Sequence, residues 1–390
     1  MLPIAAARPS CFLGEVTLER QLAELPQALI ERLRARGFSS ERLLTWARTV
    51  GVDRDLRNRL PGLVEAPKPG DIVDAPVPGT PEHARLAALG LDALRRGEVA
   101  LCVLSGGMAT RMGGVIKALV EAIPGHTFLD LRLLENAALA RAGGRAFPLW
   151  LMTSEATDQG LRAALSARLD GELLATFEQC VSLRLTPSGD LFEGGVGEHS
   201  VYATGHGDLP EALRTSGLLE GFVRRGGKVV CIANIDNLGA TVDPAIVGAH
   251  LVHGGPLTVE LVDKVGSDKG GGPVRWNGRP IITEEFRLPV GFDPATVPVF
   301  NTNTFLVSAQ ALLDLRMEWT YVEVDKTIGG EKAVQFERLL GEITAGLSPH
   351  LLRVPREGTR SRFLPVKDVP ELEKRRPEIE AIVRARGILP

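Results

Sequence analysis

Long apolar runs and clustered cysteines are both missing from this 390-residue sequence. Its longest apolar stretches, such as residues 147–152, are far too short to cross a bilayer. The first residues lack the basic-then-apolar pattern of a secretory signal. The four cysteines are scattered without metal-ligand spacing, and Cys102 and Cys231 lie inside apolar, strand-like runs. These absences predict a cytoplasmic protein with reduced core thiols and no membrane partner.

An excess of charge of either sign is also missing. The 45 Lys and Arg residues nearly balance 48 Asp and Glu residues, which leaves a formal net charge of −3 and no reason to expect nucleic acid as a partner. Local lysines can still bind small anions. A hydrophobic fraction of 44% and a charged fraction of 24% are ordinary for a globular enzyme, and no repeat or low-complexity tract occurs.

The order of local patterns predicts three regions. Residues 1–84 are predicted to be an N-terminal helical region followed by a proline-rich connector, with helices between 16 and 60. Residues 85–345 open with a helix ending at Gly97 and then alternate strands with helices, which indicates an α/β domain with a largely parallel sheet. Residues 346–390 form a short C-terminal segment. The arginines at 32–36 suit either a polyanion site or a solvated helix face, and the flanking acidic residues favour the solvated face.

The stretch from residue 99 to 117 is the centre of the sequence. A buried, β-prone run is followed abruptly by Ser105, Gly106 and Gly107, and then by Thr110, a second glycine pair and Lys117. Adjacent glycines let a backbone approach a ligand closely. A strand, a glycine-rich loop and a lysine together suit a phosphate group, since amides point at it and the lysine neutralises charge. An ordinary strand-to-helix turn with a solvated lysine fits the same residues, so both interpretations stay open here.

Two familiar phosphate loops are excluded, because no G-x-x-x-x-G-K-[ST] occurs and no G-x-G-x-x-G follows the strand. The stretch instead resembles the UTP–glucose-1-phosphate uridylyltransferases (UDP-glucose pyrophosphorylases), which read roughly L-x-G-G-x-G-T-x-M-G with a lysine shortly after. It departs from them at Ala109, where that family has glycine, and at Val115-Ile116-Lys117, where it has Gly-Pro-Lys. Further matches in the same order extend the resemblance over roughly residues 85–370.

Two downstream blocks resemble the family's nucleotide contacts. The block Phe177-Glu-Gln179 stands where the family has a glutamine that meets uracil, and an amide can both donate and accept at a pyrimidine edge. The block Thr204-Gly-His-Gly-Asp208 resembles Gly-His-Gly-Asp, although a lone histidine there would suit a turn without a ligand. The resemblance implies nucleotide contacts at Ser105, Gly106, Gly107, Thr110, Gln179, Gly205 and His206.

Residues 229–243 carry the most specific match. An apolar strand delivers Asn234, Asp236 and Asn237 at its carboxyl end, where ligands bind in open α/β sheets. A carboxylate there suits Mg²⁺, which favours one or two carboxylates plus substrate phosphate oxygens. We therefore predict that Asp236 is a metal ligand and takes part in catalysis. The competing interpretation is that Asp236 caps the next helix.

The remaining matches concern the sugar and the end of the chain. Residues 269–272 resemble a Lys-Gly-Gly loop that faces the sugar, and residues 300–304 match Phe-Asn-Thr-Asn-Asn except at Thr304. Asparagine amides are suitable partners for sugar hydroxyls. The segment Ser361–Lys367 is identical to a family motif whose lysine reaches back into the active site. The implied sugar-binding residues are Asn234, Lys269, Gly271, Asn301 and Asn303.

Two expectations about structure accompany these matches. Residues 332–337 stand where the family has Val-Ile-Gln-Leu-Glu and are predicted to open a helix. The chain leaves no room for the long C-terminal β-helix of eukaryotic members, so a monomer or a weak homodimer is expected.

The resemblance implies a GT-A-like, Rossmann-like α/β fold with a mixed, mostly parallel sheet flanked by helices. It implies transfer of a uridylyl group from UTP to a sugar 1-phosphate, most simply glucose 1-phosphate, with Mg²⁺ as cofactor and Lys117, Lys367 and Asp236 as catalytic residues. Residues 90–100 look somewhat like the corresponding part of UDP-N-acetylglucosamine pyrophosphorylases, which is the alternative within the enzyme class. A non-catalytic nucleotide-sugar-binding protein is the alternative outside it.

Overall fold

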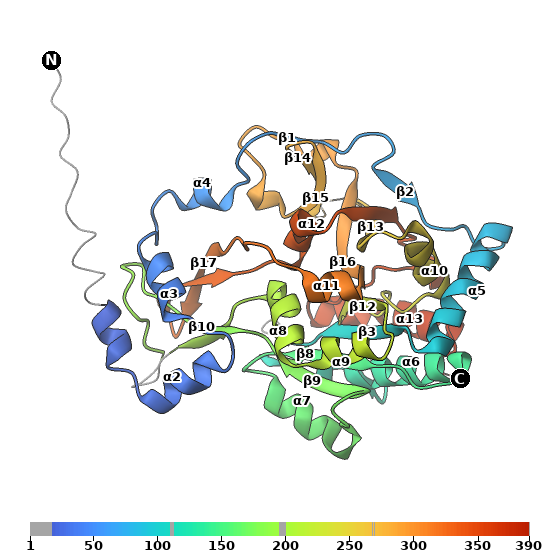
Figure 1. The fold of residues 1–390 in the computed structure, drawn as a ribbon, viewed down its shortest axis with the longest axis horizontal. Helices are drawn as coiled ribbons and strands as arrows, with labels where there is room; N and C mark the ends of the chain where they lie inside the picture. The colour runs from blue at the N-terminus through green and yellow to red at the C-terminus, as the bar shows by residue number, and fades with distance from the viewer. Residues whose placement is uncertain (1–17, 110–112, 195–199, 267, 269, 390) are drawn as a thin grey trace. The chain divides into compact units, whose positions relative to one another are not determined.

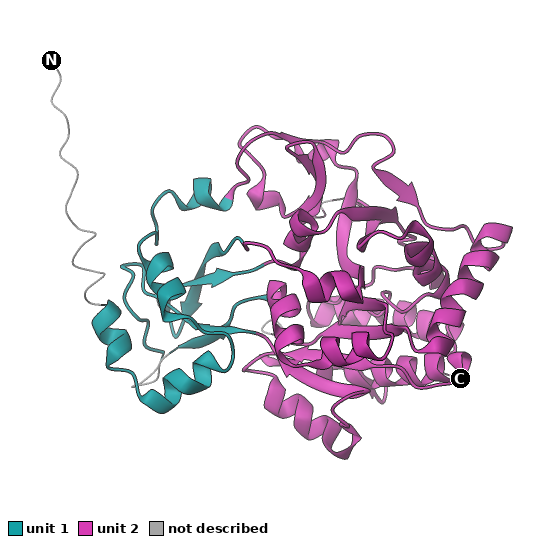
Figure 2. Ribbon diagram, viewed as in Figure 1, with its two compact units in different colours: residues 1–58, 180–205, 320–338 teal, residues 59–179, 206–319, 339–390 magenta. Residues whose placement is uncertain are grey.

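The computed structural model describes residues 18–109, 113–194, 200–266, 268 and 270–389. Clustering of contacts divides the chain into two compact units (Figure 2). One unit comprises residues 1–58, 180–205 and 320–338, and the other comprises residues 59–179, 206–319 and 339–390. Each unit is assembled from stretches that are distant in sequence. The sequence-based division at residues 84 and 345 stays a prediction.

In the described part of the larger unit, an eight-stranded sheet forms the centre (Figure 1). Its strands, in spatial order, are β2 (Ile72–Asp74), β19 (Pro349–Arg353), β13 (Leu257–Asp263), β16 (Val299–Ser308), β12 (Val229–Asn234), β3 (Val99–Leu104), β8 (Leu149–Thr153) and β9 (Leu174–Glu178). Only β16 runs antiparallel to its neighbours. The carboxyl ends of the other seven strands therefore meet at one edge of this sheet. The predicted mixed, mostly parallel α/β architecture is confirmed.

Helices cover both faces of this sheet. Alternate residues of β3 face two different hydrophobic cores, which is why the strand is buried along its whole length. One core is completed by α5 (Pro81–Arg96), α6 (Phe128–Gly143), α7 (Asp158–Leu165), α10 (Pro244–His253) and α13 (Val369–Ala385). The other is completed by α8 (Leu209–Thr215), α9 (Leu218–Arg224) and α11 (Ala309–Asp314). Cys102 and Cys231 are buried in these cores as free thiols, as predicted.

Local sequence signals set several helix ends. Thr127 and Asp130 form a reciprocal capping box at the start of α6, and Gly144 ends it in a left-handed conformation. The helix before β3 ends at Gly97 as predicted but begins at Pro81, four residues before the predicted Arg85, because Thr80 caps it. The sequence Thr153-Ser154-Glu155 is typical of a helix cap and predicts a helix start there, but this prediction is wrong, since α7 begins at Asp158 after Thr157.

Shorter elements surround the sheet. They are β1 (Val64–Glu65), β14 (Gly272–Trp276) and β15 (Arg279–Thr283), the paired β4 (Met108–Ala109) and β5 (Val115–Ile116), the paired β6 (Glu121–Ile123) and β7 (His126–Thr127), and α12 (Ile343–Gly346). No helix among the described residues is long and apolar enough to cross a membrane.

The smaller unit contains α2 (Gln27–Arg34), α3 (Ser40–Ala47), α4 (Arg54–Asn58), the pair β10 (Val181–Leu183) and β11 (Val201–Ala203), and the pair β17 (Val322–Ile328) and β18 (Glu331–Glu337). The helices at its start agree with the prediction. The predicted helix at 332–337 is wrong, because these residues form β18. Gly329 and Gly330 both have positive φ, at +59° and +92°, and make the two-residue turn that returns β18 along β17.

Candidate active site

The predicted phosphate loop is a β-hairpin. After β3, the strands β4 and β5 pair antiparallel, and Gly113 and Gly114 near the turn have φ of +84° and +76°. The returning strand brings the amide of Lys117 to 3.4 Å from the carbonyl oxygen of Gly107. Lys117 thus lies beside the first glycines, although ten residues separate it from Gly107 in sequence. Thr110 lies outside the described residues.

Lys117 and Asp236 form an ion pair at the carboxyl edge of the sheet. The Lys117 Nζ atom lies 2.5 Å from Asp236 Oδ2, and the two side chains are 18% and 13% exposed. Asp236 follows β12, whose last residue Asn234 pairs with Leu104 at the end of β3. The cap of α10 is Asp243, whose Oδ1 accepts from the Ala245 amide. The alternative that Asp236 is a helix cap is therefore wrong.

Gln179 and Gly106 lie together at the same edge. Gln179 follows β9 and is 7% exposed, and its backbone amide donates to the carbonyl oxygen of Thr153. A Cβ on Gly106 would lie 2.7 Å from Gln179 Oε1, so a larger residue here would displace the Gln179 side chain. The carbonyl oxygen of Gly106 accepts from the hydroxyl of Ser154 at 2.8 Å. Ser105 is buried and its amide completes the ladder to β8, whereas Gly107 is exposed with open space beside it.

His206 has a defined tautomer if it is neutral. Its Nδ1 atom accepts a hydrogen bond from the amide of Leu340 at 2.9 Å, so the proton of a neutral ring is on Nε2. That leaves Nε2 as a donor. Gly205 belongs to the smaller unit, where its φ is +101° and a Cβ would lie 2.5 Å from the carbonyl oxygen of Arg338. Glycine at 205 therefore has a steric reason independent of any ligand.

A β-bulge in β16 presents the predicted sugar-binding asparagines. Along β13, Glu260 pairs with Thr304 but Leu261 pairs with Asn301, so two residues of β16 are unmatched. One of them, Asn303, has φ +57°, a left-handed conformation that asparagine tolerates better than most residues. Its Nδ2 atom donates to Asn234 Oδ1 at 2.9 Å, and its amide donates to Asn301 Oδ1 at 3.1 Å. The bulge thus joins three of the predicted sugar-binding residues.

Gly271 extends this group toward a carboxylate that the sequence reasoning missed. The carbonyl oxygen of Gly271 accepts from the amide of Asn301 at 2.8 Å. A Cβ on Gly271 would lie 2.8 Å from Glu284 Oε1, and burial raises the pKa of Glu284. No motif points to Glu284, which comes just after β15 and reaches the glycine loop only in the fold. Lys269 lies outside the described residues.

The C-terminal segment folds back onto the loop after β12. The side chain of Asn237 accepts from the Leu364 amide at 2.7 Å and donates to the Arg362 carbonyl oxygen at 3.2 Å. Gly239 permits this approach, since a Cβ there would lie 2.8 Å from the carbonyl carbon of Arg362. We call residues 361–367 the strap. Both Asn237 and Arg362 lie inside motifs that match the family, and this position in a motif is the sequence signal for their structural role.

Buried arginines hold these loops from behind. Arg132 on α6 is fully buried and donates to the carbonyl oxygens of Asn234, Asn237 and Ala240 at 2.7–2.9 Å. Arg362 forms a buried ion pair with Glu260 of β13. The signal for Arg132 was a basic residue within the mostly apolar run of residues 128–134. A buried guanidinium needs such acceptors, which the turning backbone after β12 supplies.

Lys367, at the end of the strap, is exposed, and its amide donates to Glu371 Oε2 at 2.7 Å. Although burial alone would raise the pKa of Asp268, hydrogen bonds from Arg356 and the Val265 amide and the charges of Arg356 and Lys367 hold that pKa below its ordinary value. The positive charge of Lys367 therefore acts on Asp268, which lies next to the predicted sugar loop at residues 269–272.

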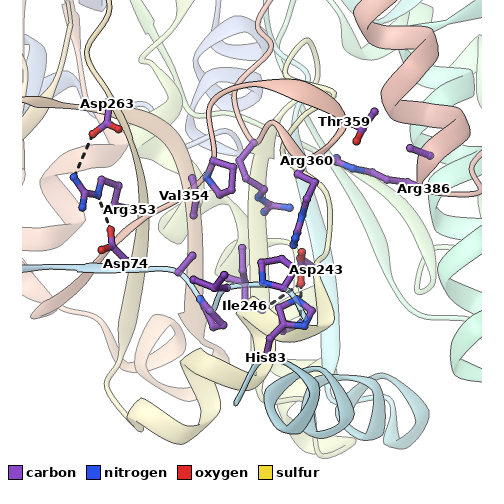
Figure 3. A pocket seen from close by; sticks show the side chains of 18 residues that line it. Asp74, His83, Asp243, Ile246, Asp263, Arg353, Val354, Thr359, Arg360 and Arg386 are labelled. Atoms are coloured by element: carbon purple, nitrogen blue, oxygen red, sulfur yellow. Dashed lines mark hydrogen bonds and ion pairs between the residues drawn. The ribbon is translucent and has the colours of Figure 1, made fainter. Parts of the chain in front are cut away.

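A separate cavity of about 560 Å³ lies beyond the carboxyl ends of β2, β13 and β19 (Figure 3). Arg353 pairs there with Asp74 at 2.6 Å and with Asp263 at 3.5 Å. Arg362 and Arg386 also line it. None of its described lining residues is a predicted site residue, so this cavity is distinct from the Lys117–Asp236 region.

Comparisons with known proteins show the family and the fold. A family model described as UTP--glucose-1-phosphate uridylyltransferase matches residues 87–374. The UTP--glucose-1-phosphate uridylyltransferase of Saccharomyces cerevisiae is 31% identical over 297 residues, which cover 70% of this chain and 58% of that protein. The chain thus matches less than two thirds of the length of such curated relatives.

Solved structures show the same fold at lower identity. A UDP-glucose phosphorylase from Trypanosoma brucei is 22% identical, with a TM-score of 0.70 over 88% of this chain and 76% of that one. A uridine diphosphate N-acetylglucosamine pyrophosphorylase from the same organism, in complex with inhibitor, is 19% identical, with a TM-score of 0.69 over 97% and 85%. At these identities the likeness concerns the fold alone.

Proposed function

This chain belongs to the UTP--glucose-1-phosphate uridylyltransferase family, and from that premise we propose that it converts UTP and glucose 1-phosphate into UDP-glucose and pyrophosphate. The observation that carries the proposal is the Lys117–Asp236 ion pair, in which Asp236 follows β12 and Lys117 follows β5 of the glycine hairpin. Together they supply a cation, a hard oxygen ligand and close backbone access, which phosphate groups require.

The proposed reaction is an in-line displacement. An oxygen of glucose 1-phosphate forms a bond to the α-phosphorus of UTP while the bond from that phosphorus to the pyrophosphate oxygen breaks. Such a reaction needs positioning and charge neutralisation more than covalent participation by the protein. We assign charge neutralisation to Lys117 and Lys367, with Lys117 also holding the ground-state triphosphate.

The residues present fit a magnesium ion that is shared with substrate. No group of three or more potential metal-ligating side chains occurs in the portion of the chain that the structure describes. Asp236 offers one partly exposed carboxylate, and Mg²⁺ commonly takes one or two carboxylates while phosphates and water complete its shell. When bound, the ion supplies charge neutralisation to the phosphates.

Substrate recognition is assigned to the neighbouring groups. Gln179 binds the uracil edge, with Ser105, Gly106, Gly107, Thr110 and Gly205 around the nucleotide, and His206 donates from Nε2 to a phosphate or ribose oxygen. Asn234, Asn301, Asn303, Gly271 and Lys269 bind the sugar. Glu284 joins them in this proposal, because a buried carboxylate beside a glycine loop can accept hydrogen bonds from two sugar hydroxyls.

Two other functions make different predictions. A UDP-N-acetylglucosamine pyrophosphorylase would prefer N-acetylglucosamine 1-phosphate, and a non-catalytic sugar-nucleotide-binding protein would release no pyrophosphate. Pyrophosphate release is to be measured with a panel of nucleoside triphosphates against sugar 1-phosphates. Preference for UTP with glucose 1-phosphate supports the proposal, and preference for the acetylated sugar or absence of release contradicts it.

Assembly and compartment also belong to the proposal. We propose a monomer or a weak homodimer in the cytoplasm. Sedimentation at micromolar concentration checks the assembly, and a stable octamer would contradict it.

A further inference from the structure

Arg386 connects two segments that are far apart in sequence. It follows α13, and its guanidinium donates to the carbonyl oxygen of Gly239 at 2.9 Å and to the hydroxyl of Thr241 at 3.1 Å. The same group donates to the carbonyl oxygen of Ser361 at 2.7 Å. One side chain therefore holds both the loop after Asp236 and the first residue of the strap.

The two segments also contact each other directly. Asn237 binds the strap backbone at residues 362 and 364, and Gly239 lies against the strap without a side chain between them. Asp236 immediately precedes this contact, and Lys367 ends the strap. The relative positions of these two groups thus depend on how firmly the loop and the strap are joined.

Only a guanidinium suits the place of Arg386. These acceptors are neutral carbonyl and hydroxyl oxygens on two backbones, and burial lowers the pKa of Arg386 to about 10. A planar fork with several donors can reach them together, whereas a lysine ammonium acts as a compact point charge. Within the described part of the chain no carboxylate forms an ion pair with Arg386, so its main contacts are the hydrogen bonds to the loop and the strap.

We propose that Arg386 is a positioning residue that fixes Asp236 relative to Lys367 by joining the loop to the strap. It lies outside residues 87–374, the part matched by the family model. The catalytic consequence rests on the proposed function. The joining of loop and strap does not, because it can be measured without turnover.

The cavity beside Arg386 makes a specific test possible. Arg386 lines the cavity of about 560 Å³, and Figure 3 labels it there near Thr359 and Arg360. If the side chain is cut back in Arg386→Ala, a free guanidinium ion can enter from this cavity and restore the lost donors. A residue that matters only for general folding would show no such rescue.

The experiment compares Arg386→Ala with Arg384→Ala. Arg384 lies in the last turn of α13, two residues before Arg386, and 57% of its side chain is exposed, which makes it a matched control. We expect Arg386→Ala to lower kcat by roughly tenfold or more while the Kd for UTP changes by less than about threefold. Guanidinium at about 20 mM, well below denaturing concentrations, should raise the kcat of Arg386→Ala several-fold. Arg384→Ala should behave like the wild type.

Hydrogen exchange supplies the readout that needs no activity. The amides of Leu364 and Ala240, which bond to Asn237, should exchange faster in Arg386→Ala and not in Arg384→Ala. Unchanged exchange and unchanged kcat overturn the proposal, as does a parallel loss of kcat and UTP affinity without rescue. If Arg386→Ala does not fold, Arg386→Gln is measured, and wild-type kcat and exchange in that variant overturn the proposal. A wild-type chain without pyrophosphate release would refute the proposed function and leave the exchange test intact.

Discussion

Replacing Asp236 by asparagine exchanges one carboxylate oxygen for an NH2 group. This turns a hard anionic metal ligand into a weak neutral one. We predict that Asp236→Asn keeps the fold and lowers turnover at least about tenfold. Activity at rising Mg²⁺ and thermal melts are to be measured together. Asp92→Asn, an exposed carboxylate on α5, serves as control. Full activity of Asp236→Asn at ordinary Mg²⁺ would remove Asp236 from the mechanism.

The two proposed catalytic lysines should respond differently to truncation. Lys117 is mostly buried against Asp236, whereas Lys367 is exposed at the end of the strap. Lys367→Ala should therefore lower kcat far more than it weakens UTP binding, and Lys117→Ala should reduce both. Steady-state kinetics and UTP titration of both variants test this. Unchanged kcat in Lys367→Ala would show that the motif has misled the assignment.

At the scale of elements, Asn303 in the β16 bulge has a side-chain role and a backbone role that can be separated by substitution. Its side chain contacts Asn234, while its backbone holds φ at +57°. Asn303→Gly removes the amide and relaxes the backbone requirement, and Asn303→Ala removes the amide but keeps a Cβ in a strained conformation. Both variants should raise KM for glucose 1-phosphate, and the alanine variant should also be less stable than the glycine variant by roughly 1 kcal/mol.

Urea unfolding and substrate titration of the two variants give the test. Equal stability with wild-type KM in both would contradict the proposed role of the bulge.

Local signals in the sequence were enough to predict some elements and not others. The end of α5 at Gly97 and the strand before Asp236 each depend on neighbouring residues, and the structure has both. Gly329 and Gly330 are a local turn signal for the hairpin of β17 and β18, whereas the family resemblance at residues 332–337 wrongly predicts a helix. The bulge at Asn303 and the approach of Glu284 to Gly271 depend on contacts between distant strands. No local pattern encodes such contacts.

At the scale of the whole molecule, the buried His250 and the half-buried His350 link stability to pH. Burial lowers the pKa of both His250 and His350 to about 4. His250 accepts or donates at Thr258, 2.9 Å away, and His350 stacks on His253 at 4.0 Å. In the unfolded chain these histidines take up protons near pH 6.5, whereas in the folded chain they take them up only near pH 4. Stability is therefore full above about pH 6.5 and falls as the pH drops toward about 4.

His250 alone should account for roughly 3 kcal/mol of that loss. His250→Asn keeps a hydrogen-bonding partner for Thr258 but cannot take up a proton in this range. The free energy of unfolding, measured in urea at pH 7.5, 6 and 5, should fall less steeply in the variant than in the wild type. Identical slopes would exclude His250 as the cause.

The pairing of β2 with β19 has a consequence for synthesis of the chain. β2 is an edge strand whose neighbour in the described sheet is β19, and the paired residues Asp74 and Arg353 are 279 positions apart. At the usual rate of about 5–20 residues per second, a ribosome needs roughly 15–55 s to reach β19 after making β2. The strap and Arg386 emerge later still. The nascent chain must therefore keep Ile72 and Val73 unpaired while most of the sheet is already made, and the edge that carries the proposed chemistry closes only after the strap and Arg386 have been synthesised.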